Sequence, residues 1–345
     1  MMQFLFIAFS IVSVTLNAQG PGNKKILDFQ NPVVDQSEIK KGENIDEKIK
    51  ENFFLKADVT TTNCYVGEPV MATFKAYSRL NANSRVVKRP ALTGFSVLEM
   101  VDAYNNEPEV EMVSGKAFNS HLIRKVQLFP LQEGKFSLEP AEVESQIFLR
   151  NPGMVKHLTL ETPPIMITVK ALPVKNQPDS FSGAVGDFSI ELQMKDTDLN
   201  QYDPATVRLV IKGTGNLPLI TDPEITWPKG AAVSAPKVTE NVNKYVFPLS
   251  GSKVFEYTLE SHEPGEYVID AINFSYFDPA SATYKTALTQ QVKFTVKKGE
   301  KKIDPIEKII HNQENIPVQY YYFGVIGLAI TGWIIYQAVR SSGKK

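Results

Sequence analysis

The feature that most constrains the fold is a series of short segments in which apolar and polar residues alternate. A period of two is typical of β-strands that bury one face. Gly, Pro, Asn and Asp separate the segments, and only residues 44–50 show weak helix potential before the C-terminal end. The pattern predicts an all-β body made of β-sandwiches. The clearest segments are Val70–Tyr77, Ile123–Leu131, Pro164–Leu172, Phe188–Met194, Ala205–Gly213, Lys253–Ser261 and Gln290–Lys298.

Two sequence patterns occur twice in the chain. "VQLFPLQEGKFSLEPAEV" (Val126–Val143) and the segment from Leu259 to Phe274 both read as strand, turn with glycine, strand. In addition, Tyr65 and Tyr202 are each followed by apolar residues five, seven and nine positions later. Such internal echoes indicate repeated structural units.

The spacing of these echoes predicts two tandem immunoglobulin-like β-sandwich domains. We place the first at residues 52–171 and the second at residues 181–297, each near the usual size of about 100 residues. The segment "LPVKNQPDSFSG" contains prolines and small polar residues, so residues 172–180 are interpreted as a linker. Residues 19–51 are interpreted as a polar lead outside both cores, with one short helix as an alternative, and residues 298–317 as a charged stalk.

The two ends of the chain predict export and membrane anchoring. Residues 1–18 form an apolar run typical of a signal peptide, and an uncleaved anchor is the alternative. Residues 318–339 carry no charge over the length needed to cross a bilayer, so they predict one C-terminal transmembrane helix that contacts the lipid bilayer. The basic tail at residues 340–345 favours a cytoplasmic C-terminus. We therefore expect a single-pass protein of the bacterial inner membrane, with its domains in the periplasm.

Composition excludes some classes of partner. The 37 Lys and Arg residues balance 38 Asp and Glu residues and are scattered, so nucleic-acid binding is not expected. Cys64 is the single cysteine, so no disulfide within the chain can form. We interpret Cys64 as a buried small side chain, with a redox or intermolecular thiol as the alternative. The absence of bridges favours a bacterial periplasm over a eukaryotic extracellular space.

A search for catalytic chemistry finds no constellation to build on. The four histidines, His121, His157, His262 and His311, lie far apart, and no HExxH, CxxC or G-x-S-x-G motif is present. We therefore expect no enzyme activity, no cofactor, no metal site and no small-molecule substrate.

Two polar motifs have structural explanations that compete with ligand binding. "DTDLNQYD" (Asp196–Asp203) begins like a calcium loop but has Gln201 where an EF-hand needs glycine, so a solvated turn is favoured. "GTGN" (Gly213–Asn216) follows a strand without a helix or lysine behind it, so a loop with positive φ is favoured over a phosphate cradle.

Four aromatic residues and two glycines are the remaining candidates. Trp227, Phe274, Tyr276 and Phe277 are predicted to be core residues, and an interaction surface for a partner is the alternative. Gly134 and Gly265 are predicted to be structural turns. Because Gly265 follows a proline, we expect a hairpin with a type II turn that places this glycine at positive φ.

Several longer motifs resemble the BatD family of bacterial exported membrane proteins, which is associated with oxygen tolerance. In the second half these are "GTGNLPLI", "PEITWPKGAAV", "FEYTLESHEPGEYVIDAINFSYFDP" and a closing "VKFTV"; in the first half they are "YVGEPV", "GFSVLEM" and "LFPLQEGKFSLEPAEV". The chain departs from many family members by stopping at Lys345, soon after the apolar run.

The resemblance implies a Bat-type system. Such a system contains a MoxR-type AAA+ ATPase, membrane-anchored von Willebrand factor A domain proteins and sometimes a tetratricopeptide-repeat protein. By this analogy we expect a periplasmic scaffold or adaptor that binds other Bat components, linked to oxygen or envelope stress tolerance. The alternative is a cell-surface or cell-wall binding protein of the adhesin kind, because such proteins also carry tandem immunoglobulin-like domains.

Overall fold

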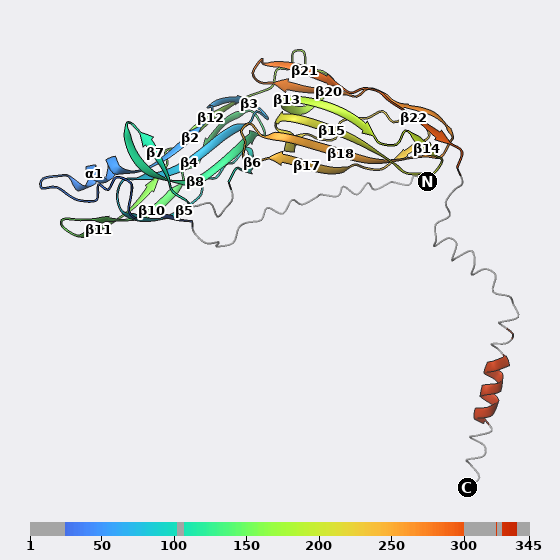
Figure 1. The fold of residues 1–345 in the computed structure, drawn as a ribbon, viewed down its shortest axis with the longest axis horizontal. Helices are drawn as coiled ribbons and strands as arrows, with labels where there is room; N and C mark the ends of the chain where they lie inside the picture. Colours follow the sequence, from blue (N-terminus) through green and yellow to red (C-terminus); the bar gives the residue numbers. More distant parts are fainter. Residues whose placement is uncertain (1–24, 102–106, 300–321, 323–325, 337–345) are drawn as a thin grey trace, which may run out of the picture.

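The computed structural model describes residues 25–101, 107–299, Tyr322 and residues 326–336. Its body is built almost entirely from β-strands, which form two domains lying end to end (Figure 1). The predicted all-β body is confirmed.

The predicted membrane-targeting segments are largely outside the described residues. This holds for the whole signal peptide at residues 1–18, the tail at residues 340–345 and all but the first two residues of the stalk. Of the predicted span, the structure describes Tyr322 and residues 326–336, which are helical. Among the described helices, none combines the length and apolarity that crossing a membrane requires. The transmembrane helix therefore stays a prediction.

The first domain contains three sheets around one core. A four-stranded sheet has the order β1(Ile26–Asp28), β5(Ala82–Lys88), β10(Glu142–Leu149), β11(Met154–Glu161). A five-stranded sheet has the order β2(Phe53–Val59), β4(Val70–Ser78), β8(Lys116–Pro130), β6(Phe95–Glu99), and β7(Glu109–Val113) also pairs with β8. A short sheet has the order β3(Asn63–Tyr65), β12(Ile165–Lys170), β9(Gly134–Leu138).

The second domain contains one large and one small sheet. The seven-stranded sheet has the order β16(Ala231–Val233), β18(Ser250–Ser261), β15(Ala205–Gly215), β13(Phe181–Met194), β20(Asn273–Asp278), β21(Thr283–Leu288), and β17(Lys237–Asn243) also pairs with β18. The small sheet has the order β14(Asp198–Asn200), β22(Val292–Lys297), β19(Gly265–Ile269). A short 3₁₀ turn, η1(Leu217–Leu219), follows β15.

The two domains repeat one pairing scheme. β3, β12 and β9 in the first domain correspond to β14, β22 and β19 in the second, with the same parallel and antiparallel pairs. β4 and β8 likewise correspond to β15 and β18. All seven predicted strands exist. In the tyrosine echo, the alternating residues after Tyr65 and Tyr202 are buried, because one face of β4 and of β15 covers each core: Val70, Ala72, Phe74 and Val207, Leu209, Ile211.

The glycine-containing echo is a connection between sheets, and the predicted hairpin is wrong. β8 and β18 lie in the large sheets, whereas β9 and β19 pair with β12 and β22 in the small sheets. Each turn therefore carries the chain across the core. Gly134 has φ +139°, but the φ of Gly265 lies outside the +20° to +160° range. The predicted positive-φ turn at Gly265 is therefore also wrong.

The polar lead belongs to the first domain. Leu27 and Phe29 are fully buried in its core cluster, and β1 pairs with β5. The helix α1(Ile45–Asn52) begins after Asn44, whose side chain accepts hydrogen bonds from the backbone N–H groups of Asp46 and Glu47. The prediction that residues 19–51 lie outside the cores is thus wrong for residues 25–51, because a few apolar residues in a polar segment suffice to anchor it.

A buried junction joins the domains. Gln127 on β8 is 0% exposed; its Nε2 donates to the Val246 carbonyl at 2.8 Å, and its Oε1 accepts from the Leu249 N–H at 2.8 Å. Phe129, also on β8, is a member of the second domain's core cluster. Both polar atoms of the buried Gln127 amide are thus paired with backbone groups of the second domain. The two domains therefore pack against each other and are not connected by the linker alone.

Candidate functional site

The aromatic interaction surface, which was the alternative to a core role, is not accessible at three of its four residues. Phe274, Tyr276 and Phe277 are 1%, 7% and 0% exposed, so the interpretation of these residues as a binding surface for an external partner is wrong. Phe277 instead meets the Tyr65 ring of the first domain edge-on, with centroids 4.9 Å apart. Phe277 and Tyr65 therefore form part of the domain junction.

Trp227 also belongs to a packed environment. It is partly buried against the second core and lies edge-on to Tyr257, with ring centroids 5.0 Å apart. The core interpretation, which the alternation pattern favoured, therefore describes this aromatic set better than a surface patch.

The thiol of Cys64 is buried. It is 2% exposed, and burial together with the nearby Glu68 carboxylate raises the pKa of the thiol to about 12. A thiol with so high a pKa is almost fully protonated at neutral pH and is a poor nucleophile. The interpretation of Cys64 as a small packing residue is supported by this burial.

The histidines do not form a site among the described residues. His121 is buried and lies edge-on to Phe29, His157 is exposed on β11, and His262 lies 3.0 Å from the Glu260 carboxylate. His311 lies outside the described residues. Within the part of the chain that the structure describes, no group of three or more His, Cys, Asp and Glu residues could hold a metal ion.

The "GTGN" motif has a structural role at the sheet end that meets the first domain. Gly213 and Gly215 have φ +154° and +140° and lie within β15. The buried Asn216 side chain accepts from the Val185 N–H and donates to the Gly183 carbonyl. A Cβ on Gly67 of the first domain would lie 2.9 Å from the Asn216 Nδ2. The motif therefore fixes backbone geometry at the junction.

One accessible feature, with a groove beside it, is the free edge of β11. This strand pairs with β10 on one side, and no described strand pairs with its other side. The Thr162 N–H donates to the Ala141 carbonyl on the β10 side, and the direction alternates along a strand. The N–H and C=O groups of Val155, His157, Thr159 and Glu161 therefore point to the open edge.

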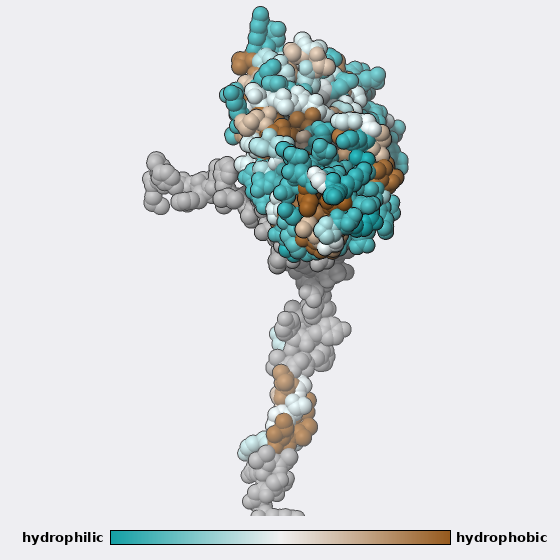
Figure 2. Space-filling model, turned by 90° about the vertical axis from the view of Figure 1, so that its left-hand side faces the viewer, coloured by the Kyte–Doolittle hydropathy of each residue, from teal (hydrophilic) through white to brown (hydrophobic). Residues whose placement is uncertain are grey.

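An apolar groove lies along one face of β11. It has a volume of about 330 Å³ and runs between β11, β2 and α1. Lys156 is fixed at its rim by an ion pair with Asp46 on α1 at 2.9 Å. Its apolar lining consists of Ile49, Phe53, Phe54, Leu55, Leu158 and Leu160. Figure 2, which looks onto this end of the molecule, shows hydrophobic patches among hydrophilic residues.

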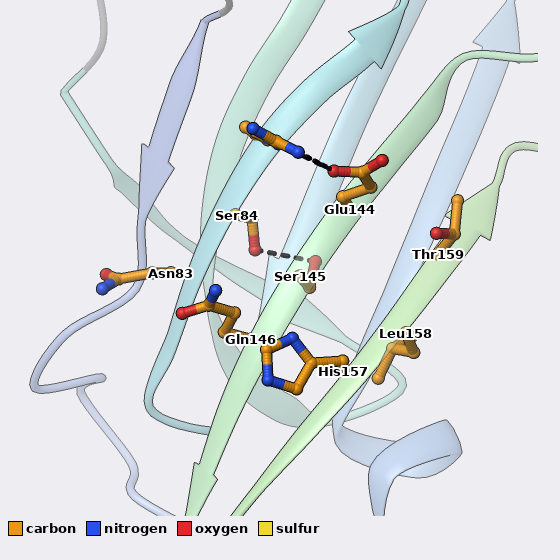
Figure 3. A pocket seen from close by; sticks show the side chains of 9 residues that line it. Asn83, Ser84, Glu144, Ser145, Gln146, His157, Leu158 and Thr159 are labelled. Carbon is orange, nitrogen blue, oxygen red and sulfur yellow. Dashed lines mark hydrogen bonds and ion pairs between the residues drawn. The ribbon is translucent and has the colours of Figure 1, made fainter.

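A polar trough lies on the opposite face of the same sheet. It has a volume of about 610 Å³ and is drawn in Figure 3. An ion pair joins Arg85 to Glu144, and the Ser84 and Ser145 hydroxyls lie 2.8 Å apart beneath it. Leu158 also lines the trough, and amide, hydroxyl and imidazole groups make up the rest: Asn83, Gln146, His157 and Thr159.

Sequence reasoning missed this site. The segment "MVKHLTLE" does alternate, so its strand character was available from the sequence. Its position at a sheet edge was not, because strand order depends on which distant segments pair.

Comparisons with known proteins bear mainly on the second domain. Residues 192–296 match the family described as "BatD DUF11 like domain". No curated protein matches the chain.

Several solved structures share a distant likeness. The D00-D0 domain of Intimin is 13% identical, covering 70% of this chain and 99% of that chain with a TM-score of 0.15. The Escherichia coli adhesin FdeC is 13% identical, covering 71% and 63% with a TM-score of 0.18. The Yersinia pseudotuberculosis adhesin InvE is 11% identical, covering 71% and 59% with a TM-score of 0.19. Such low TM-scores support no inference about function.

The family match concerns the second domain. It covers the strands from the end of β13 to β22, which include the "GTGN" and "HEPGEY" motifs quoted for the resemblance. Residues 192–296 are therefore similar to the BatD family's DUF11-like domain.

Proposed function

We propose that the chain is a membrane-anchored periplasmic scaffold or adaptor of a Bat-type complex. Its partners in this proposal are von Willebrand factor A domain proteins and the system's MoxR-type ATPase, and its role is in oxygen or envelope stress tolerance. The protein acts by binding and not by catalysis.

The observation that carries the proposal is the open edge of β11. An unpaired strand edge offers main-chain hydrogen bonds to a partner strand, and an adjacent apolar groove offers pockets for its side chains. Natural proteins normally protect such edges, so a long free edge is a candidate contact surface. β11 has eight residues and lies beside the apolar groove.

The packed junction supports the same role. Because Gln127 and Phe129 bury themselves between the domains, the edge is held in a defined position relative to the second domain. A fixed geometry reduces the entropy lost when a partner binds. Anchoring in one membrane would also raise the effective concentration of partners that share that membrane.

In-cell crosslinking tests this proposal. A photo-crosslinking residue replaces Val155, which is half exposed on β11, in the full chain in intact cells. We expect capture of membrane proteins with von Willebrand factor A domains. The matched control replaces Val268, an exposed valine on β19 of the second domain, and should not capture them. Equal capture from both positions, or capture from neither, would contradict the proposed contact surface.

A second candidate function is cell-wall binding, which the polar trough favours. Its lining of hydroxyl, amide and guanidinium groups suits the hydroxyl groups of a glycan. A pull-down with isolated peptidoglycan distinguishes the two functions. Retention of the wild-type chain, and its loss on Gln146→Ala, would favour wall binding, whereas no retention favours the adaptor.

A further inference from the structure

The outward-facing residues of β11 are complementary to themselves. In an antiparallel pair about a twofold axis, each residue lies opposite the residue at the mirrored position. If the axis passes through Thr159, His157 lies opposite Glu161 of the second strand, and Glu161 lies opposite the second His157. We propose that β11 pairs in this register with β11 of a second copy of the chain.

The groove face agrees with the same register. Leu158 lies opposite Leu160 of the second copy, and this contact also occurs twice. Both leucines line the apolar groove, so the pairing covers apolar surface that is otherwise partly exposed. Lys156 is held by Asp46 at 2.9 Å and needs no partner across the edge.

Neighbouring registers match less well. An axis at His157 would place two imidazole rings opposite each other, and an axis at Leu158 would place apolar Val155 opposite the Glu161 carboxylate. Matched cross-strand pairs stabilise a sheet, and mismatched ones weaken it. The Thr159 register therefore has the best charge and apolar complementarity of the three.

The chain also limits the length of the pairing. Pro163 and Pro164 directly follow the strand after Thr162, and proline has no N–H to donate. In the Thr159 register, Val155 would lie opposite Pro163, so regular pairing ends at residues 157 and 161. Three outward residues per copy then give about six main-chain hydrogen bonds.

The inference rests on the proposed function only in taking the β11 edge as a contact surface. It assigns residues 157–161 of that edge to a second copy, and Val155, which lies beyond the regularly paired residues, stays available to a heterologous partner. The two four-stranded sheets would join into one continuous sheet, leaving the second domain and its junction unchanged. A scaffold of two copies would present each heterologous binding surface twice, which strengthens weak contacts.

Disulfide trapping tests the register in the full chain. The native Cys64 is buried, so a cysteine introduced on β11 is the accessible thiol among the described residues. Thr159→Cys in membranes, with copper phenanthroline as oxidant, should shift the protein to twice its mass, and reductant should reverse the shift. Val110→Cys on β7, at an exposed position of another edge, should stay monomeric.

Mixed samples distinguish this register from random collision. His157→Cys and Glu161→Cys should crosslink when the two variants are co-expressed and neither should crosslink alone. Identical positions would be separated by about 14 Å, four residues along the strand, which exceeds the reach of a disulfide. Crosslinking of His157→Cys with itself would overturn the register.

The outcomes also separate this inference from the proposed function. If Thr159→Cys traps only a different protein, pairing between copies is wrong while the β11 contact surface stands. If Thr159→Cys and the Val155 photo-crosslinker trap nothing, both fail. Homodimer trapping together with capture of von Willebrand factor A proteins from another position would support self-pairing and move the heterologous contact elsewhere.

Discussion

Replacement of Gln127 by leucine should weaken the attachment between the two domains. Gln127 is fully buried, and its amide pairs with both the Val246 carbonyl and the Leu249 N–H at 2.8 Å. Leucine has a similar volume but no polar atom, so the substitution removes both hydrogen bonds without leaving a large cavity.

The expected cost follows from the surroundings of the two partners. Leu249 is fully buried, so its N–H loses its partner without access to water, which costs about 1–3 kcal/mol. Val246 is 46% exposed, so its carbonyl can regain a water molecule and should contribute about 1 kcal/mol or less. The free energy of unfolding should therefore fall by about 1–4 kcal/mol.

Urea unfolding of the full chain in detergent, followed by tryptophan fluorescence, measures this loss. The matched control is Gln146→Leu, an exposed glutamine on β10, which should change the free energy by less than about 0.5 kcal/mol. Limited proteolysis should also cut the residue 172–180 linker faster in Gln127→Leu. A loss equal to that of the control would refute the view that this amide holds the junction.

Four further substitutions test local parts of the fold. Gly215→Ala should lower the free energy of unfolding by more than about 2 kcal/mol, because the new Cβ would lie 2.2 Å from a backbone carbonyl oxygen. Gly265→Ala should change it by less than about 0.5 kcal/mol, because the nearest atom to its Cβ would be 3.6 Å away. Similar melting temperatures for the two variants would contradict this. Asn44→Ala should lower the free energy of unfolding, measured with urea, by about 1 kcal/mol, because it removes the N-cap of α1. An unchanged free energy would show that packing alone holds the helix. The pKa of Asp278 is lowered from 3.8 to about 2, and hydrogen bonding to Lys285 is the largest cause. The unfolded chain therefore binds a proton at Asp278 more readily than the folded chain does. The stabilisation from this carboxylate is present above about pH 4 and is lost as the pH falls toward 2. Asp278→Asn should flatten that part of the pH dependence of the urea midpoint, and an unchanged slope would contradict the assignment.

The alternation of apolar residues determined the strands, because strand faces are selected locally by what they bury. The inward positions of β4 and β15 could thus be read from the residues that follow Tyr65 and Tyr202. The same information could not distinguish a hairpin from a connection between sheets. In both cases, a turn separates two alternating segments, and only their distant partners differ.

Tertiary structure decided the roles of residues that sequence patterns leave equivalent. Phe277 was a candidate for an external contact, but packing against Tyr65 makes it part of the domain junction. Gln127 carries no sequence signal, because a buried amide is identified only by the two backbone groups it satisfies. The β11 edge likewise arises from strand order. The sequence by itself determined the β-rich class, the repeat and the likeness of residues 192–296 to a BatD domain. Which surfaces are buried and which strand edges stay open depended on long-range pairing.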